Sequence, residues 1–584
     1  MNIIGVNAYH GDSSACILLD GKLVAAVEEE RFRRIKHWAG FPSQSIEYCL
    51  EEAGLRLGDI DVIAVNSDPK ANAMKKIGYA IKKRPSLSVI VEKVKIARKR
   101  QSISDELALH FPDQNFKGVI DHVEHHLAHL ASAYYASPFD QALAVSVDGF
   151  GDFSSSAWGI GEGQSLDVKS YVHFPHSLGI FYQALTQYLG FPNYGDEYKV
   201  MGLSPYGKPT HMDQMREIVR LQENGGFELK LDFFRHHQEN ISYQWENHIP
   251  EVAELYSSEL EDLLGPARRA DESLTQVHYD IAKSIQTMYE EAFFHLVNTI
   301  HKDNAIDNLT VAGGCGMNSV ANGKVYRKSN IKQVYIQSAA GDAGGAIGAA
   351  YVVAAKNDKI GPESRMQHAY WGPAYSDDSI KKMLEAHRDE IEEANCRVEH
   401  FDDEQALYER TAKAIDAAGV IGWFQGRLEW GPRALGNRSI LADPRRSDMK
   451  DILNLKIKRR ESFRPFAPSI LREDVNEWFE EDDEVPFMMK VFQIREEQRE
   501  KIPAVTHVDG SGRLQTVFQK TNEKYYGLIS TFKALTGVPI LLNTSFNENE
   551  PVVCRPEEAL NCFLRTKMDV LVCGNYFIER LNNN

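Results

Sequence analysis

The sequence predicts a two-domain α/β protein, with a first domain over residues 1–360 and a second over residues 361–584. Three observations lead to this prediction. A chain of 584 residues is long enough for two or three domains. Two glycine-rich segments, 309–327 and 337–352, each have the pattern of a strand, a turn and a helix. A polar stretch punctuated by Gly and Pro, residues 355–372, then separates them from a second part rich in arginine.

Composition narrows the class of protein. The chain has 66 basic and 83 acidic residues, a net charge of −17, which argues against a general nucleic-acid-binding protein. No apolar run approaches the ~20 residues of a membrane span, and the first residues lack the pattern of a signal peptide. The seven scattered cysteines form no CxxC pair and indicate reduced thiols. We therefore expect a globular, cytoplasmic protein without a membrane or nucleic-acid partner.

The N-terminus has the pattern of a nucleotide-binding turn. Residues 2–8 predict a buried strand, HGDSSA a tight turn that projects His10 and Asp12, and residues 16–30 a hairpin around Asp20-Gly21. Actin–hexokinase-type folds start in this way, with backbone N–H groups of the turn holding nucleotide phosphates. On these residues alone, a solvated hairpin turn is an equally good interpretation.

The next segments are a basic cluster, a helix and a strand. Residues 30–42 carry the cluster, which includes Lys36, and a helix over 42–55 and a strand over 59–67 follow. Residues 75–100 form a basic helical stretch. We expect a solvated helix pair there, with docking of an anionic acceptor or a partner as the alternative.

A candidate metal site follows in residues 125–152. His125 and His129 are four residues apart in a run with helical character, so both imidazoles face one side of a helix. Asp148 ends the apolar run ALAVSV. Two nitrogens and a carboxylate oxygen suit a divalent transition metal. A HxxxH pair on its own is more often structural than metal-binding, so the assignment depends on motifs elsewhere in the chain.

The middle of the chain alternates loops and helices. The loop 191–209 is rich in Gly, Pro, Tyr and charge, a composition typical of contact-forming loops. Residues 208–272 predict a peripheral insertion, and a long amphipathic helix runs over 273–300. In the glycine-rich segments, Asn318 opens one helix and Asp342 lies at the other turn, as a candidate fourth metal ligand. Together with the N-terminal hairpin, the two glycine-rich segments predict two lobes that close on a nucleotide.

The second domain concentrates its chemistry in residues 427–468. The domain begins with a helix over 402–418 and a buried strand, and the cations of residues 427–468 include Arg427, Arg433, Arg438, Arg445, Arg446, Lys456, Lys458, Arg459, Arg460 and Arg464. Many are interleaved with Gly, Pro and Asn, which predicts loops that position guanidinium groups for phosphate or carboxylate. Further on, Arg513 follows a DGSG turn, and a buried strand runs into a polar turn at Asn543-Thr544-Ser545.

These ordered motifs resemble the NodU/CmcH-type carbamoyltransferases. The segments that carry the resemblance are GVNAYHGDSSA, VAAVEEERF, HHLAHLASAYYASPF, SVDGFGD, GGCGMNS, GDAGGAIGA, WGPRALGNRSILADPR, FRPFAP and NTSFN. The resemblance implies an actin–hexokinase-like, two-lobed first domain similar to the tRNA threonylcarbamoyl-transfer protein, and a YrdC-like second domain. It also implies an ATP-dependent O-carbamoyltransferase: the second domain forms carbamoyladenylate from carbamoyl phosphate and ATP, and the first passes the carbamoyl group to a hydroxyl of a small metabolite or sugar, releasing AMP.

The resemblance also implies roles for individual residues. The metal ligands, for Fe²⁺ or another divalent ion, are His125, His129, Asp148 and Asp342. The residues for carbamoyl phosphate and ATP, the latter with Mg²⁺, are Arg433, Lys458, Arg464, Arg513 and Asn543. The nucleotide contacts of the first domain are Asp12, Gly313, Gly314 and Asn318. His10 and Lys36 match catalytic positions near the transfer site, and we infer that His10 is the general base. A homodimer is possible.

Three alternatives remain at this point. A tRNA threonylcarbamoylation enzyme is disfavoured by the net charge of −17. A sugar kinase of the actin–hexokinase type would yield ADP and would leave the basic second domain unexplained. A degenerate binding or scaffold protein would have no reason to keep the His/His/Asp/Asp set and the arginine cluster.

Overall fold

The computed structural model describes residues 1–83, 103–238, 243–244, 250–458, 461, 463–464 and 466–581. It divides into two compact units, Met1–Met366 and Gln367–Asn584, where the sequence predicted a boundary after residue 360. Most of the basic stretch 75–100 lies outside the described residues. Within the described part of the chain, none of the helices is long and apolar enough to cross a membrane.

The first unit contains two five-stranded sheets with the same topology. Their strand orders are β3-β2-β1-β4-β5 and β14-β13-β6-β7-β8. In each sheet three consecutive strands form an antiparallel meander, and two later strands add in parallel beside the first of them. The repeated topology gives the two lobes of the predicted actin–hexokinase-like fold. The strands are β1 Asn2–Asn7, β2 Ser14–Leu19, β3 Lys22–Glu28, β4 Val62–Val65, β5 Val119–His122, β6 Gln141–Gly151, β7 Ser154–Glu162, β8 Ser165–His173, β13 Asn308–Ala312 and β14 Gln333–Tyr335.

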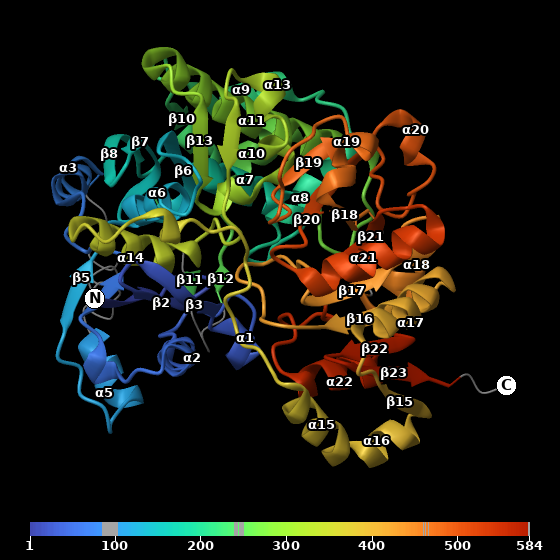
Figure 1. Ribbon diagram of the computed structural model, residues 1–584. Coiled ribbons are helices and arrows are strands. Elements are labelled where there is room, and N and C mark those ends of the chain that lie inside the picture. Colours follow the sequence, from blue (N-terminus) through green and yellow to red (C-terminus); the bar gives the residue numbers. More distant parts are fainter. Residues whose placement is uncertain are drawn as a thin grey trace. The chain divides into compact units, whose positions relative to one another are not determined.

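Helices α6 (His125–Tyr134) and α14 (Gly344–Lys356) lie side by side and connect the two sheets (Figure 1). Helix α14 packs on β1 and β4, whereas α6 packs on β6 and β13. Glycine makes the close approach possible, because a Cβ at Gly348 would lie 1.8 Å from the carbonyl oxygen of Ala128. The run of small residues after Asp342 therefore brings that carboxylate next to the histidine helix.

Several predicted elements of the first unit are confirmed. Asp20 and Gly21 both have positive φ, 48° and 85°, as a tight two-residue hairpin turn requires. The long helix is α11, Gln276–Asn304. The predicted insertion contains short elements of its own, including α9, the β9–β10 hairpin and α10. The other helices of this unit and the short strands are α1 Glu30–Arg33, α2 Ser43–Ala53, α3 Ala73–Lys83, α5 Ile103–His110, α7 Leu178–Tyr188, α8 Glu197–Leu203, α9 Met212–Ile218, α10 Ser258–Leu264, α12 Ser319–Asn322, α13 Val325–Lys328, β9 Val219–Leu221, β10 Phe227–Leu229, β11 Tyr243–Gln244 and β12 Glu251–Val252.

The second unit is built on one mixed nine-stranded sheet of order β15-β23-β22-β16-β17-β21-β18-β20-β19. This α/β architecture agrees with the predicted fold class. The strands are β15 Cys396–His400, β16 Ile421–Phe424, β17 Arg438–Ala442, β18 Ala467–Leu471, β19 Lys490–Gln493, β20 Ser511–Val517, β21 Ile540–Ser545, β22 Val570–Cys573 and β23 Tyr576–Arg580. The helices are α15 Asp377–Ala386, α16 Arg388–Glu393, α17 Glu404–Asp416, α18 Met449–Leu453, α19 Val475–Trp478, α20 Glu496–Arg499, α21 Glu523–Thr536 and α22 Pro556–Arg565.

Two sequence predictions for this unit were wrong in detail. The unit begins with α15, α16 and β15, ahead of the helix predicted at 402–418, which is α17. Residues Asn543–Ser545 are not a polar turn but the end of β21, paired with β17 from Ser439↔Ser545 to Ala442↔Leu542. Strands on both sides pair with the backbone of β21, so its polar side chains do not interrupt it.

Candidate functional site

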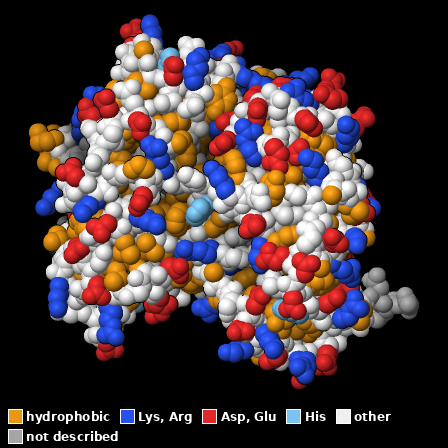
Figure 2. Space-filling view, in the orientation of Figure 1, with side chains coloured by type: hydrophobic (Ala, Val, Ile, Leu, Met, Phe, Trp, Pro, Cys, Tyr) orange, Lys and Arg blue, Asp and Glu red, His pale blue; other side chains and the backbone are white. Residues whose placement is uncertain are grey.

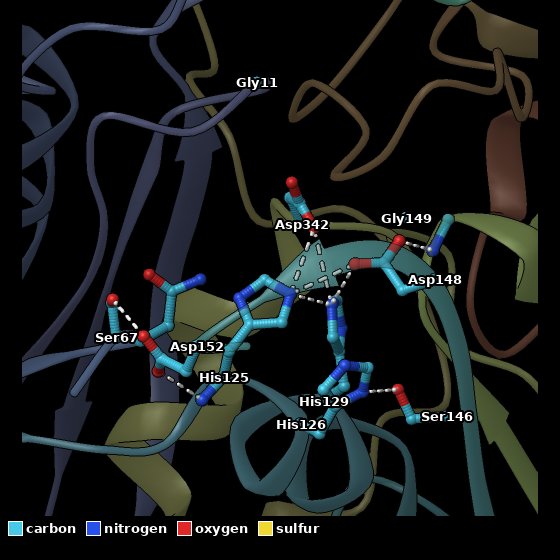
Figure 3. Close-up of polar contacts among 12 residues, drawn as sticks. Gly11, Ser67, His125, His126, His129, Ser146, Asp148, Gly149, Asp152 and Asp342 are labelled. Carbon is cyan, nitrogen blue, oxygen red and sulfur yellow. Dashed lines mark hydrogen bonds and ion pairs between the residues drawn. The ribbon is translucent and has the colours of Figure 1, made fainter. Parts of the chain in front are cut away.

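Four predicted metal ligands meet in the first unit (Figure 3). One turn of α6 places His125 and His129 on one face, and their Nε2 atoms are 3.0 Å apart. Strand β6 brings Asp148 Oδ2 to 3.1 Å from His125 Nε2. The turn before α14 brings Asp342 Oδ1 to 3.4 Å from His129 Nε2 and 3.6 Å from His125 Nε2. Helix, strand and turn thus aim four donor atoms at one point.

The four side chains fit a single divalent cation. Ligand–metal distances of ~2.0–2.2 Å place neighbouring donor atoms ~3.0–3.5 Å apart, and the separations above fall in or close to this range. Asp342 Oδ1 is buried and has no hydrogen-bond partner among the described residues. Such an atom is costly unless a proton or a cation neutralises it. Two imidazoles and two carboxylates form a donor set typical of first-row transition metals.

The same proximity changes the pKa values of the cluster. Burial alone would lower the pKa of His129, but the neighbouring carboxylates of Asp148 and Asp342 raise it to about 10. Burial raises the pKa of Asp148, yet its two histidine partners hold that pKa well below the ordinary value. Burial and the charge of Asp148 raise the pKa of Asp342. A cation bound here would replace the imidazole protons.

Residues outside the cluster hold its ligands in place. Asp152 accepts hydrogen bonds from the backbone N–H of His125 at 2.9 Å and of Asp68 at 2.7 Å. It also accepts a hydrogen bond from the Ser67 hydroxyl at 2.9 Å. Asp152 therefore links the start of α6 to the segment after β4 (Figure 3). Sequence reasoning missed Asp152, although the second aspartate of DGFGD was a signal for it.

Of the nucleotide residues predicted in the first unit, Gly314 contacts this cluster and Gly313 lies against the strand that carries Asp148. Gly314 donates its N–H to Asp148 Oδ1 at 2.8 Å, which fixes that carboxylate. Gly313 has φ +86°, and a Cβ there would lie 2.2 Å from the carbonyl oxygen of Val147. Asn318 caps α12 by accepting the N–H of Ala321. Because α12 has only four residues, it is a weaker phosphate-binding corner than the sequence suggested.

The predicted catalytic residues lie in the same unit. The ring of His10 is 8 % exposed, and its centroid is 5.2 Å from that of His125. Lys36 is exposed and precedes His37. Asp12 Oδ1 lies 2.8 Å from His37 Nδ1. His10 therefore lies beside the metal-ligand cluster, while Asp12 contacts a histidine that the sequence analysis did not single out.

In the second unit, four cations of the basic segment contact carbonyl or carboxylate groups of the chain itself. Arg438 is fully buried and donates to backbone carbonyl groups, including those of Asn437, Pro373 and Gly426 at 2.9–3.1 Å. The others form ion pairs at 2.6–2.7 Å: Arg445–Asp443, Arg446–Asp448 and Lys456–Asp569. Basic and acidic side chains are likewise interspersed on the face that Figure 2 shows. Arg459 and Arg460 lie outside the described residues.

The loop that carries Arg433 is held firmly. Glu429 Oε1 accepts the backbone N–H groups of Leu435, Asn437 and Arg438 at 2.8–3.1 Å. Asn543 Nδ2 donates to the carbonyl oxygen of Ala434 at 3.1 Å. Asn543 is 1 % exposed, so it supports this loop from inside the unit.

The other predicted phosphate residues differ in their surroundings. Gln515 Nε2 donates to the carbonyl oxygen of Leu435 at 2.8 Å, and Arg513 lies two residues earlier on the same face of β20. Arg433 and Arg513 thus come from adjacent elements. Lys458 Nζ is buried and donates to Ser545 O, Asn547 O and Asn547 Oδ1, each at 2.7 Å. Arg464 lies 3.5 Å from Glu461, next to residues outside the described set.

Comparison with known proteins identifies the family. The profile "Carbamoyltransferase N-terminus" matches residues 2–351, and "Carbamoyltransferase C-terminus" matches residues 412–580. The chain is 40% identical over 583 residues to the nodulation protein NolNO of Sinorhizobium fredii, covering 98% of this chain and 80% of that protein. It is 38% identical over 619 residues to the uncharacterized protein sll1178 of Synechocystis, covering 99% and 97%.

A third relative is the 3'-hydroxymethylcephem-O-carbamoyltransferase of Amycolatopsis lactamdurans, 34% identical over 271 residues, 46% of this chain and 48% of that protein. Both family profiles match in the expected order, and together they cover most of the chain. The protein therefore belongs to the carbamoyltransferase family.

Proposed function

We propose that this protein is an O-carbamoyltransferase that uses carbamoyl phosphate and ATP. The second unit forms carbamoyladenylate with Mg²⁺ and ATP, and the first unit transfers the carbamoyl group to a hydroxyl of a small metabolite or sugar. Membership in the family supports carbamoyl transfer. The observation that carries the proposal is the convergence of His125, His129, Asp148 and Asp342 in the first unit.

The first half-reaction needs positive charge held in place. Water cleaves carbamoyl phosphate to carbamate and orthophosphate, and the carbamate oxygen then displaces pyrophosphate from the α-phosphorus of ATP. Both substrates are polyanions that repel each other. Arg433 and Arg513 come from rigidly held elements, so their guanidinium groups would be in position before charge develops on the leaving phosphate.

In the second half-reaction the acceptor oxygen attacks the carbamoyl carbon, and the bond from that carbon to the AMP oxygen breaks. A divalent cation held by the cluster would supply Lewis-acid polarisation of an oxygen and a lowered pKa for a bound hydroxyl. The ring of His10 lies beside His125, and in this proposal His10 takes the proton of the acceptor hydroxyl. Asp152 and Gly314 keep the ligands oriented.

The test separates the two half-reactions. The purified protein, loaded with Fe²⁺, is incubated with ATP, Mg²⁺ and carbamoyl phosphate without an acceptor, and pyrophosphate and phosphate are measured. Pyrophosphate release that depends on carbamoyl phosphate supports the adenylate step. A panel of hydroxylated metabolites and sugars is then screened for AMP release and a carbamoylated product. Formation of ADP with a phosphorylated sugar would instead indicate a kinase and would overturn the proposal.

A further inference from the structure

His37 is fixed between two segments of the first unit. Its Nδ1 lies 2.8 Å from Asp12 Oδ1, in the turn between β1 and β2. Its backbone N–H donates to Glu30 Oε2 at 2.8 Å. The ring of Tyr194, from the loop 192–196, packs edge-on against the imidazole with centroids 5.3 Å apart and an interplanar angle of 77°. These contacts determine the orientation of the ring.

The orientation leaves Nε2 as the ring nitrogen available to a ligand. A Cβ at Gly195 would lie 2.6 Å from His37 Nε2, so this atom faces the loop 192–196. About a third of the His37 side chain is exposed, 34 %. The structure gives Nε2 no hydrogen-bond partner among the described residues, whereas Nδ1 is held by Asp12.

The neighbours of His37 favour its charged form. Burial lowers the pKa of His37, but the carboxylates of Asp12 and Glu30 outweigh burial and the opposing charge of Lys36, and raise it to about 9. The other titratable groups near the ring are Tyr194, whose pKa burial raises well above its usual value, and Glu197, whose pKa burial raises to about 7. His37 therefore carries a proton on both nitrogens at neutral pH.

We propose that His37 is a phosphate-binding residue of the first unit, whose Nε2–H donates to a phosphoryl oxygen of the carbamoyl donor, and that Asp12 is its positioning residue. This inference rests on the proposed function, in which the donor in this unit is an adenylate. It also changes the role of Asp12. A carboxylate repels phosphate, and its oxygen already contacts His37, so the predicted nucleotide contact passes through the imidazole.

The position of Tyr194 connects this residue to the metal-ligand cluster. A Cβ at Gly11 would lie 2.4 Å from the Tyr194 hydroxyl oxygen, so that hydroxyl touches the β1–β2 turn. The charges of both Asp342 and Asp12 also contribute to the raised pKa of Tyr194. Tyr194 thus lies near both the His37–Asp12 pair and the metal-ligand cluster. A donor whose phosphate binds His37 would direct its carbamoyl group toward the cluster.

The test measures AMP binding by titration calorimetry on the full chain carrying Arg433→Ala, which removes the proposed clamp of the second unit. Adding His37→Gln should weaken the affinity for AMP by about 10–100-fold, because a hydrogen bond from a charged donor is lost. The matched control is His301→Gln, which removes another histidine paired with a carboxylate, Asp307, in the same unit. That control should leave AMP affinity unchanged. Equal AMP affinity in the His37→Gln and parent chains would overturn the inference.

The pH dependence distinguishes a charged ligand-binding role from a structural one. AMP affinity should be full below the pKa of His37 and fall as pH rises from about 7.5 to about 10 through that pKa, about 9. Asp12→Asn removes the stabilising carboxylate, so the fall should occur at lower pH. An unchanged profile in Asp12→Asn would refute its positioning role.

A failure of the proposed function can be distinguished from a failure of the inference about His37. It shows as the absence of pyrophosphate release with carbamoyl phosphate in the chain without substitutions. If release is absent but His37→Gln still weakens AMP, the phosphate-binding residue stands and the proposed function fails. If release is present and His37→Gln changes neither AMP affinity nor transfer, the proposed function stands and the inference fails.

Discussion

In the first unit, four ligand atoms of two chemical types point at one another, whereas in the second unit many cations of the arginine-rich segment already have partners inside the chain. Asp342 Oδ1 of the first unit is buried without a hydrogen-bond partner among the described residues. Arg438, Arg445, Arg446 and Lys456 of the second unit each contact carbonyl or carboxylate groups of the chain. The number of basic residues is therefore a weaker sign of a binding site than a set of mixed ligands that converge.

The largest effect is expected at the cluster. His129→Ala removes a metal ligand and should reduce carbamoyl transfer more than ~100-fold. Mutation of residues that merely hydrogen-bond to metal ligands already lowers metal affinity or activity by about 10–100-fold. Pyrophosphate release by the second unit should persist. His126→Asn is the control, since His126 Nδ1 forms a hydrogen bond with the Ser146 hydroxyl at 2.9 Å and not with a ligand of the cluster. Loss of pyrophosphate release in a folded His129→Ala protein would contradict the separation of the two reactions.

Arg433→Ala tests whether the held loop of the second unit positions a functional cation. The first half-reaction should fall about 100-fold, and supplied carbamoyladenylate should restore transfer. Arg446→Ala removes an arginine paired with Asp448 at the surface and should keep pyrophosphate release within about twofold. Failure of carbamoyladenylate to restore transfer would remove Arg433 from the proposed clamp.

Gly348→Ala tests how far the cluster depends on the packing of α6 against α14. The added Cβ would meet the carbonyl oxygen of Ala128 at 1.8 Å, so we expect about 1–3 kcal/mol less stability in urea unfolding. Metal affinity should weaken too, because the helices carry or adjoin the ligands. Gly78→Ala is the control: it lies in α3 and its Cβ would meet nothing within 4 Å. Equal stability of the two variants would contradict this account of the packing.

The smallest effect concerns Glu197, the first residue of α8, which follows the loop that holds Tyr194. Burial raises the pKa of Glu197 from 4.5 to about 7, so the folded state holds its proton more tightly than the unfolded state. Its contribution to stability is full below the unfolded pKa and is lost as pH rises through about 7. Relative to Glu197→Gln, the unsubstituted protein should lose urea stability between about pH 5 and pH 8. A constant difference would contradict the raised pKa.

The sequence determined the parts of this protein whose signals are local. The spacing of His125 and His129 on one helix face, the glycines that open α14 after Asp342, and the Asp20-Gly21 turn are all properties of a few neighbouring residues. The ordered motifs also indicate the family from the sequence itself. Helix period, turn chemistry and short motifs depend on backbone geometry that is the same in every protein.

Only the tertiary structure decided which polar groups satisfy one another. The sequence placed Asn543 in a turn and gave Asp12 a direct nucleotide role, but the structure puts Asn543 in a strand under the Arg433 loop and Asp12 on His37. It also revealed Asp152 and paired four cations of the basic segment internally. Hydrogen bonds and ion pairs form between residues far apart in sequence. Their partners are therefore fixed by how sheets and helices pack, which the sequence pattern does not encode locally.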